Sequence, residues 1–337
     1  MNTISLKTNP IILSKNISVG LVQQPPVFMN LNESVKNALH FVDDCVNKGA
    51  EIIVFPETWL PGYPVWLDYS PKAGLWDHTP AKTLFRLLFE NSLEINDEYF
   101  IQLQKSAQKN KCVIVMGCHE KKGRTLYNTI FYFKADGSFE LHRKLMPTYT
   151  ERLIWGIGDG STLPVFEHKK TRIGGLICWE HWMPLSRAAM QHQNEDIHIA
   201  QWPMVKDLHQ IASRHYAFEG QCYVLACGCT LTKQQMIDGL NSVCKTEEDK
   251  LALELIYEIP GSGNDFVLHG GSSIIKPDTG FLVEPVLDKN ELIFADLNMN
   301  ILSEGNLFLD TAGHYSRPDV FQLLVDTRAK KNVEFEN

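Results

Sequence analysis

The sequence predicts an α/β protein in which two β-sheets pack face to face and helices cover the outer faces. Apolar strand-like segments alternate with amphipathic helices along the chain, and such strands need cover on both sides. Many strands share few helices, so the second sheet has to supply part of that cover. The composition, with 44% hydrophobic and 21% charged residues and no long low-complexity tract, is typical of a folded globular chain.

The first third of the chain shows this alternation of strands and helices. Residues 17–22 form an apolar strand that Pro25 and Pro26 separate from a helix beginning near Asn32. The helix keeps its apolar residues on one face, and Gly49 stands where a helix stop is expected. Buried strands are predicted at residues 51–55 and 112–118, with a second amphipathic helix at residues 97–109 between them.

The remainder of the chain is predicted to consist mainly of strands. Two β-rich runs, 130–133 and 139–142, flank Asp136-Gly137, which is a strong hairpin signal. Further strands are predicted at residues 175–179, 197–202, 223–227, 272–276, 281–286 and 291–296, with a helix at about 207–219. The charged segment 231–265 is interpreted as a peripheral insertion. Its Gly261 and Gly263 do not make a phosphate loop, because no strand and helix bracket them.

Bulk properties exclude several classes of function. The net charge of −8 argues against a nucleic-acid partner and mildly favours neutral or cationic small molecules. No apolar run of eighteen residues predicts a membrane helix, and residues 1–16, a polar N-terminal extension, lack the pattern of a signal peptide. A cytoplasmic location is therefore expected. The eight cysteines are interpreted as reduced thiols, and Cys227 and Cys229 have no second pair at zinc-site spacing.

The first candidate site residue is Glu57, which follows the buried strand at 51–55 and Pro56. In α/β sheets, sites collect at the edge outside the carboxyl ends of the strands, and a carboxylate at a strand end faces that edge. Taken alone, a glutamate in this position is more often a turn or helix cap.

The second candidate is Lys144, at the end of the hairpin's second strand and shortly before Pro147. An exposed surface lysine is the ordinary explanation for such a residue. Glu151 and Trp155 follow in a connection that is unusually rich in polar and aromatic groups.

The third candidate is Cys178, which a strand delivers into a turn directly before Trp179, Glu180 and His181. A thiol is a weak nucleophile until it is deprotonated, so a catalytic cysteine needs a base or a positive charge near it. A core cysteine is one alternative. A papain-like pair of Cys178 with His181 is another, although the two residues stand three apart in a turn.

Together these segments resemble the nitrilase branch of the carbon-nitrogen hydrolase superfamily. The matching motifs are Phe-Pro-Glu-Thr at 55–58, Arg-Lys-Leu-Met-Pro-Thr at 143–148, Glu-Arg-Leu-Ile-Trp-Gly at 151–156, Cys-Trp-Glu-His at 178–181 and Gly-His-Tyr-Ser-Arg-Pro-Asp at 313–319. The resemblance extends from about Ile17 to Leu323. It implies a four-layer α-β-β-α sandwich, with a carbon-nitrogen hydrolase domain at 17–325 and a C-terminal tail at 326–337.

The resemblance also implies the roles of the site residues. Cys178 would be the nucleophile, Glu57 the general base, Lys144 the cation that stabilises developing negative charge, and Glu151 a supporting carboxylate. Aliphatic amidases and ω-amidases of this superfamily usually carry tyrosine and aspartate after the cysteine, so the Trp179-containing motif favours a nitrilase. Hydrolysis of an organic nitrile to a carboxylic acid and ammonia through a thioimidate and a thioester needs no metal and no organic cofactor.

The substrate pocket and the assembly are less constrained by the sequence. Tyr63, Trp155, Trp179 and Trp202 are expected to line a pocket for an aryl or arylacetonitrile substrate, although aromatic residues often serve only core packing. An amidase or a cyanide-hydrating enzyme with the same residues is the main alternative, and a non-catalytic binding domain is the other. The resemblance implies a homodimer or a larger spiral oligomer. The C-terminal stretch 317–337 is expected to reach across a dimer or to fold back on its own subunit.

Overall fold

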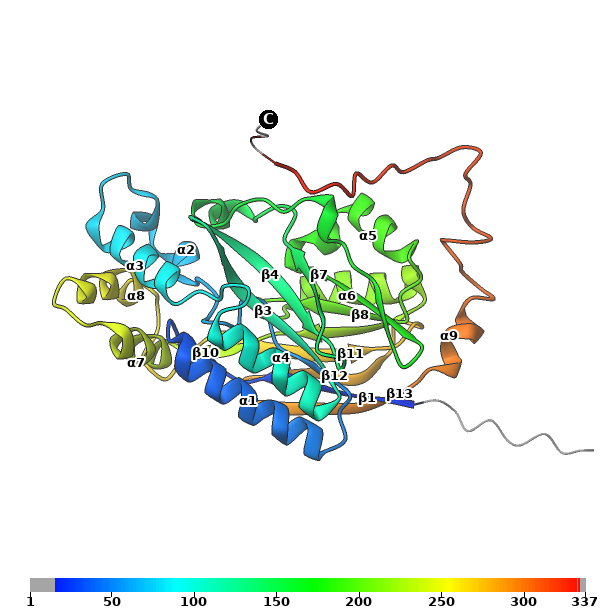
Figure 1. Ribbon diagram of the computed structural model, residues 1–337, viewed down its shortest axis with the longest axis horizontal. Helices are drawn as coiled ribbons and strands as arrows, with labels where there is room; N and C mark the ends of the chain where they lie inside the picture. The colour runs from blue at the N-terminus through cyan, green and yellow to red at the C-terminus, as the bar shows by residue number, and fades with distance from the viewer. Residues whose placement is uncertain (1–15, 332, 334–337) are drawn as a thin grey trace, which may run out of the picture.

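The computed structural model describes residues 16–331 and 333, and the chain forms two β-sheets flanked by helices (Figure 1). Most of the predicted N-terminal extension and the end of the C-terminal tail lie outside these residues. The six-stranded sheet has the order β13 (Glu291–Asn298), β1 (Asn16–Gln23), β2 (Ile52–Val54), β3 (Val113–Lys122), β4 (Thr125–Phe133) and β5 (Phe139–Arg143). The seven-stranded sheet has the order β10 (Thr230–Thr232), β11 (Phe266–Ile275), β9 (Tyr223–Cys227), β8 (Ile197–Gln201), β7 (Thr171–Ile177) and β6 (Phe166–His168), and β12 (Phe281–Leu287) also pairs with β11.

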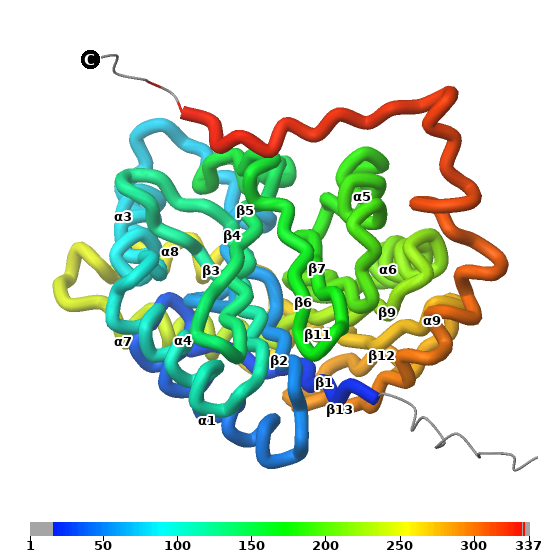
Figure 2. The backbone as a smooth tube through the Cα atoms, turned by 45° about the vertical axis from the view of Figure 1, so that its right-hand side comes forward, coloured from blue at the N-terminus to red at the C-terminus, as the bar shows by residue number. Residues whose placement is uncertain are grey.

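Helices cover both outer faces of the paired sheets, which gives the predicted four-layer α-β-β-α sandwich. Figure 2 shows α1 (Leu31–Asn47) and α4 (Glu98–Asn110) on the side of the six-stranded sheet. It shows α5 (Pro184–Gln191) and α6 (Asp207–Gly220) on the side of the other sheet. No helix among the described residues combines the length and the apolar composition needed to cross a membrane.

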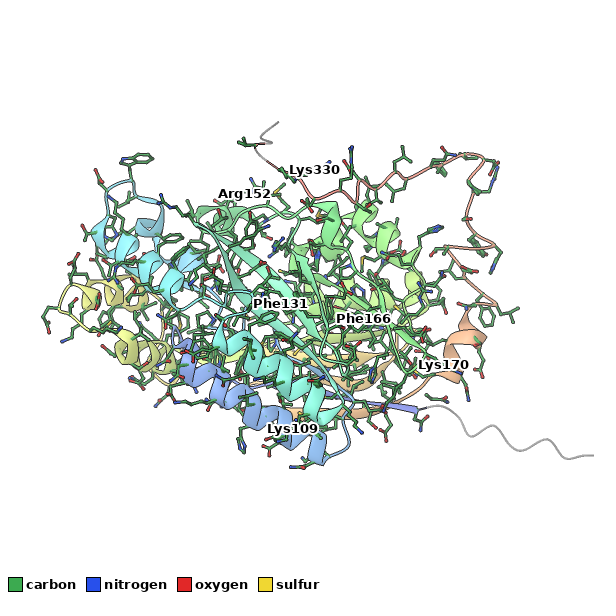
Figure 3. The ribbon with its side chains drawn as sticks, in the orientation of Figure 1. Lys109, Phe131, Arg152, Phe166, Lys170 and Lys330 are labelled. Carbon is green, nitrogen blue, oxygen red and sulfur yellow. The ribbon has the colours of Figure 1, made fainter. Side chains whose placement is uncertain are left out.

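Strand alternation divides the buried apolar residues between two clusters. In β2, Ile52 and Val54 belong to the cluster between the sheets, whereas Ile53 belongs to the cluster beneath α1 and α4. Phe131 of β4, labelled in Figure 3, belongs to the second cluster, and its ring centroid lies 5.3 Å from that of Phe100 in α4. The parallel strands β1, β2 and β3 are therefore buried on both faces, as their continuous apolar runs require.

The segment 231–265 is helical and lies at one end of the molecule (Figure 1), as predicted, but it packs into the core and is not an inserted loop. The segment forms α7 (Lys233–Val243), the 3₁₀ helix η5 (Asp249–Ala252) and α8 (Leu253–Tyr257), with buried apolar residues in the same cluster as α1 and α4. These helices lie beside α3 (Thr79–Glu90) at one end of the molecule (Figure 1). The many charged residues of this segment make the apolar faces of its helices hard to recognise in the sequence. Arg86 of α3 forms an ion pair with Asp249 of η5.

The strand predicted at residues 175–179 ends two residues earlier, at Ile177. A 3₁₀ helix, η4 (Cys178–Trp182), begins directly at the cysteine, whose φ is 51°. The other predicted strands are present within a few residues, although β3 continues to Lys122 and β11 begins at Phe266. The Asp136-Gly137 hairpin joins β4 to β5 as predicted.

After α9 (Asn300–Gly305), the chain runs without strand structure along the surface of its own subunit, past α5 (Figures 1 and 2). Lys330, labelled in Figure 3, lies near the end of this path, and its backbone N–H donates to Asp159 Oδ2 over 2.8 Å. Phe321 and Leu324 remain 77% and 91% exposed. The segment therefore folds back on its own subunit while leaving apolar side chains uncovered.

Candidate active site

Three of the predicted site residues follow the ends of three different strands. Glu57 comes after β2 and Lys144 directly after β5, both in the six-stranded sheet, whereas Cys178 follows β7 of the other sheet. Glu151 lies in the short 3₁₀ helix η2 (Tyr149–Leu153) that follows β5. All four side chains meet where the two sheets face each other, and Lys144 is only 1% exposed.

The turn that carries Glu57 is held tightly against β3. A side chain at Gly117 of β3 would place its Cβ 2.1 Å from Pro56 O and 2.7 Å from Thr58 N, so only glycine allows the turn to approach the strand. The Glu57 N–H donates to Trp202 O over 3.3 Å, which ties the turn to the second sheet. The carboxylate is consequently fixed at a strand end, as its position in the sequence indicates.

Lys144 forms two hydrogen-bonded ion pairs with buried carboxylates. Its Nζ donates to Glu57 Oε1 over 2.8 Å and to Glu151 Oε2 over 2.7 Å. Glu151 also accepts a hydrogen bond from Tyr63 Oη over 2.8 Å, and Asn128 Nδ2 donates to Glu57 Oε1 over 2.7 Å. The two explanations of Glu57 as a cap and of Lys144 as a surface lysine do not fit these contacts.

Glu57 has one carboxylate oxygen left for the thiol. The carboxyl group lies close enough to the Cys178 thiol to raise its pKa, and Glu57 Oε2 has no hydrogen-bond partner among the described residues. His181 lies elsewhere, because its Nδ1 contacts the backbone oxygen of Cys178 at 2.8 Å. The papain-like alternative is therefore wrong, and the group that can take the proton from sulfur is a carboxylate.

Burial and the neighbouring charges set the protonation states in the site. Burial raises the pKa of Glu57 to about 7, with Glu151 adding to the rise and Lys144 and Asn128 opposing it. Burial and Glu57 hold the pKa of the Cys178 thiol well above its usual range, although Lys144 opposes them. Burial lowers the pKa of Lys144, but Glu57, Cys178 and Glu151 outweigh it and raise that pKa. Near neutral pH the site thus holds a thiol, an ammonium and a carboxylate that can take a proton.

A second buried ion pair connects the cysteine turn to the lysine strand. Glu180 Oε2 accepts from the Ile177 N–H over 2.6 Å and lies 2.8 Å from His142 Nε2, while its Oε1 accepts from the Leu145 N–H over 2.6 Å. His142 and Leu145 flank Lys144 along the chain, and Ile177 directly precedes Cys178. Burial raises the pKa of Glu180, but His142 and the two N–H groups outweigh it and lower that pKa. One carboxylate therefore fixes the spacing between Cys178 and Lys144.

A cavity of about 190 Å³ opens onto the cysteine. Its apolar wall contains Val65, Trp179, Met204, Val267 and Leu268, and its polar wall contains Asp68, Thr148, Thr150, Lys206 and His209. Tyr63, Glu151 and Cys178 also line it. An apolar wall with a few convergent polar groups is the usual form of a small-molecule site.

Two of the four residues expected to contact substrate line the cavity, namely Tyr63 and Trp179. Trp155 and Trp202 do not. Trp155 donates its Nε1–H to His119 Nδ1 over 3.0 Å beneath Lys144, and its ring centroid lies 5.6 Å from Lys144 Nζ. Trp202 is fully buried, with its ring stacked between those of His181 and His209. The pocket prediction is corrected for these two residues, which support the walls rather than form them.

The reasoning from sequence missed Asn128 and His209. Asn128 lies in β4, where its position facing Glu57 depends on pairing with β3 and β5, and no local pattern marks it. His209 lies in the first turn of α6, and its apolar helical context gave no signal of a cavity.

Comparison with known proteins agrees with this geometry. The chain matches the carbon-nitrogen hydrolase family over residues 18–304. It is 34% identical to an aliphatic nitrilase of Rhodococcus rhodochrous over 95% of this chain and 82% of that protein. It is 32% identical to nitrilase 1 of Arabidopsis thaliana over 99% and 94% of the two chains. A bifunctional nitrilase/nitrile hydratase of Lupinus angustifolius is 34% identical over 95% and 88%.

Solved structures share the fold at lower sequence identity. A CN-hydrolase superfamily protein of Xanthomonas campestris has a TM-score of 0.65 and 13% identity, covering 93% of this chain and all of its own. Nit3 of Saccharomyces cerevisiae, a member of the nitrilase superfamily, has a TM-score of 0.61 and 17% identity over 93% and 100%.

Proposed function

This chain belongs to the carbon-nitrogen hydrolase family, and we propose that it is a nitrilase that converts an organic nitrile into a carboxylic acid and ammonia, with Cys178 as nucleophile. Family membership makes it an enzyme that acts on carbon-nitrogen bonds. The observation that carries the assignment of the residues is the free oxygen of Glu57 beside the thiol, while Lys144 occupies the other oxygen.

In the first half of the reaction, the thiol adds to the nitrile. Glu57 Oε2 takes the thiol proton as the sulfur of Cys178 bonds to the nitrile carbon, and one π bond of the nitrile becomes a lone pair on nitrogen. Lys144 Nζ and the Trp179 N–H stabilise the negative charge that develops there. Glu57 then returns its proton to that nitrogen, which gives a neutral thioimidate and restores the carboxylate.

In the second half, water replaces nitrogen and then sulfur at the same carbon. Glu57 takes a proton from a water molecule as it adds to the thioimidate carbon, and it passes this proton to the nitrogen. Glu57 then moves the hydroxyl proton of the tetrahedral intermediate to the same nitrogen, so that ammonia leaves as the C=O bond of the thioester forms. A second water, activated in the same way, releases the carboxylic acid and returns the proton to the sulfur of Cys178. Because its pKa is raised, Lys144 keeps its charge and acts by stabilising negative charge rather than by donating a proton.

The cavity supports a compact substrate with an apolar group. A site of about 190 Å³ is slightly larger than an apolar cavity of roughly 150 Å³ that holds benzene, so one aromatic ring and a nitrile group fit. Trp179 and Leu268 lie on the apolar wall that would contact such a ring. We therefore assign arylacetonitriles and short aliphatic nitriles as the substrate class, to be compared with a two-ring nitrile that exceeds this volume.

An amide is the second candidate product. The Lupinus relative is named as both a nitrilase and a nitrile hydratase. The tetrahedral intermediate carries both nitrogen and sulfur, and expulsion of sulfur instead of ammonia would release an amide. The ratio of acid to amide, measured by chromatography of the products, distinguishes the two outcomes.

The experiment that tests the function replaces the nucleophile. Cys178→Ala should abolish ammonia release from every nitrile in a panel of aliphatic, aryl and arylacetonitriles, with no loss of folded structure. Cys222→Ala, at a fully buried cysteine of the same sheet region, is the matched control and should keep turnover. Ammonia release by Cys178→Ala at a rate near that of the unchanged enzyme would overturn the assignment.

We further propose that the enzyme is cytoplasmic and assembles as a homodimer or a larger spiral oligomer. All eight cysteines are free thiols, which suits a reducing compartment. Leu185 of α5 and the apolar side chains of the C-terminal segment, among them Phe321 and Leu324, are uncovered and are available to a second copy. Light scattering across a concentration series measures the mass, and a monomer with full activity throughout would contradict the assembly.

A further inference from the structure

A continuous chain of buried polar groups runs behind the nucleophile, and the mechanism above does not use it. Glu195 contacts His198 Nδ1 at 3.0 Å, His198 Nε2 lies 3.0 Å from His181 Nε2, and His181 Nδ1 lies 2.8 Å from the backbone oxygen of Cys178. Tyr216 Oη donates to Glu195 Oε2 at the far end. The three titratable side chains are at most 5% exposed, so water does not intervene in their contacts.

The protons in this chain can be counted from its contacts. Each of the three contacts, from Glu195 to His198, from His198 to His181 and from His181 to the Cys178 oxygen, needs one hydrogen. Otherwise two lone pairs would face each other in a buried site. Two neutral imidazoles supply only two hydrogens. The buried group therefore holds a third proton, in the hydrogen bond between Glu195 and His198, which balances the carboxylate charge.

The direction of the last hydrogen bond is also determined. A carbonyl oxygen can only accept, so His181 Nδ1 donates to Cys178 O, and His181 Nε2 then accepts from His198. Burial and His198 hold the pKa of His181 well below its usual range, which keeps this ring neutral. From His198 onward, each hydrogen bond is thus donated in the direction of Cys178.

The peptide at the end of the chain is the one that joins Cys178 to Trp179. In a planar trans peptide the C=O and N–H groups point in opposite directions, so the Trp179 N–H points away from His181. Cys178 and Trp179 both line the cavity, and among the described residues the Trp179 N–H has no acceptor. A donor bound to the carbonyl oxygen draws electrons from the amide and strengthens the opposite N–H as a hydrogen-bond donor.

We infer that Glu195, His198 and His181 form a positioning relay that orients and polarises the Cys178–Trp179 peptide, so that its N–H stabilises the charge developing on the substrate nitrogen. This inference rests on the proposed nitrile hydrolysis at Cys178.

Packing around the relay fixes its rings in place. His198 stacks on Tyr216 with ring centroids 3.6 Å apart, and His181 stacks on Trp202 at 4.8 Å. A Cβ at Gly174 of β7 would lie 2.1 Å from Glu195 Oε1, so this glycine leaves the space that the carboxylate fills. Rings stacked in this way can transmit polarisation without rotating away from their hydrogen-bond partners.

The first test compares two reactions of the same thiol. Nitrile hydrolysis places negative charge on nitrogen, whereas alkylation of Cys178 by iodoacetamide expels iodide and places no charge near the Trp179 N–H. We expect His181→Phe to lower kcat for nitrile hydrolysis on the order of ten- to a hundredfold, less than the roughly 10²–10³-fold cost of a whole oxyanion donor, and to leave the alkylation rate nearly unchanged. His181→Asn keeps a donor near the position of Nδ1, so it should recover part of kcat.

The controls separate a relay from a merely structural role. Tyr132→Phe removes a buried hydroxyl that has no hydrogen-bond partner among the described residues, and it should keep both rates. If His181→Phe lowers hydrolysis and alkylation equally, the ring only positions the cysteine and the inference is overturned. An unchanged kcat overturns it as well. The proposed function stands or falls separately, because only Cys178→Ala tests it.

The second test observes the hydrogens directly. In the ¹⁵N NMR spectrum of histidine-labelled enzyme, His198→Gln and His181→Asn assign the two signals by their loss. We expect His198 Nε2 and His181 Nδ1 to carry hydrogen and His181 Nε2 to carry none. In Glu195→Gln, which removes the carboxylate charge, the His181 Nδ1–H signal should shift. A His181 signal that does not respond to Glu195→Gln would show that the far end of the relay does not polarise the peptide.

Discussion

Replacing Lys144 with methionine tests the centre of the site most directly, since the substitution keeps the length of the side chain and removes its charge. Two buried carboxylates, Glu57 and Glu151, then lose their common cation. Breaking a buried ion pair in this way typically costs about 3–5 kcal/mol of folding free energy. We expect Lys144→Met to lose about that much in urea unfolding at pH 8, and less at pH 5, where the carboxyl groups can take up protons.

The loss of activity should exceed what the loss of stability explains. If Lys144 stabilises the developing charge as much as one oxyanion-hole donor, kcat falls by about 2.7–4 kcal/mol, or roughly 10²–10³-fold. Lys144 is also the main group that lowers the pKa of Glu57, so without it this pKa rises above about 7 and the base is protonated at neutral pH. Steady-state ammonia release at a temperature where the variant is folded measures this loss.

A double variant and a surface control make the test sharp. Lys144→Met with Glu151→Gln removes one of the two unpaired carboxylates, so it should recover stability without recovering kcat. Lys36→Met removes an exposed lysine that pairs with Glu33 over 2.7 Å, and it should change the unfolding free energy by only about 0.5 kcal/mol. Should Lys144→Met keep kcat within a few-fold of the unchanged enzyme, charge stabilisation by this residue would be refuted.

Three further outcomes follow from the geometry. The kcat/KM of the unchanged enzyme should rise as the pH increases through about 7, because the base must be unprotonated and the pKa of Glu57 is about 7. Glu57→Gln should be nearly inactive. If the residual activity of this variant rises over the same pH range, the titrating group is not Glu57. Cys227→Ala and Cys229→Ala should keep kcat and lower the free energy of unfolding, measured in urea, by roughly 1 kcal/mol. A variant that is inactive but as stable as the unchanged enzyme would point to a different site. Trp179→Ala should raise the KM for phenylacetonitrile more than the KM for acetonitrile. Equal changes in the two KM values would show that Trp179 does not contact the aromatic ring of the substrate.

Positions at strand ends were the part of the site that the sequence could predict. Glu57, Lys144 and Cys178 each follow a predicted strand, and the carboxyl ends of strands collect at a common edge. The order of strands and helices along the chain could also be predicted, because apolar residues repeat about every second residue in strands and every 3.6 residues in helices. These repeats are visible in a single sequence. The cysteine turn was misjudged by two residues, since an apolar run does not reveal that the backbone leaves the strand at Ile177.

The pocket was harder to predict because its walls come from segments far apart along the chain. Val65 and Leu268 are separated by some two hundred residues, yet both line the cavity. Trp202 follows a strand near the nucleophile and was expected to face substrate, but stacking between His181 and His209 turns it into the interior. Proximity in sequence to the candidate residues thus said little about which way an aromatic side chain points.

The ratio of charges in the site explains why a carboxylate rather than a histidine can serve as its base. One buried cation, Lys144, faces two carboxylates, so the lysine cannot fully neutralise both of them. Burial and the second carboxylate, Glu151, both raise the pKa of Glu57, and Lys144 limits the rise to about 7. A glutamate at its ordinary pKa of about 4.3 would be a poor acceptor for a thiol proton. Without the lysine, however, it would stay protonated at neutral pH. The triad of charges therefore places the base where it can both accept the proton of Cys178 and return it to nitrogen.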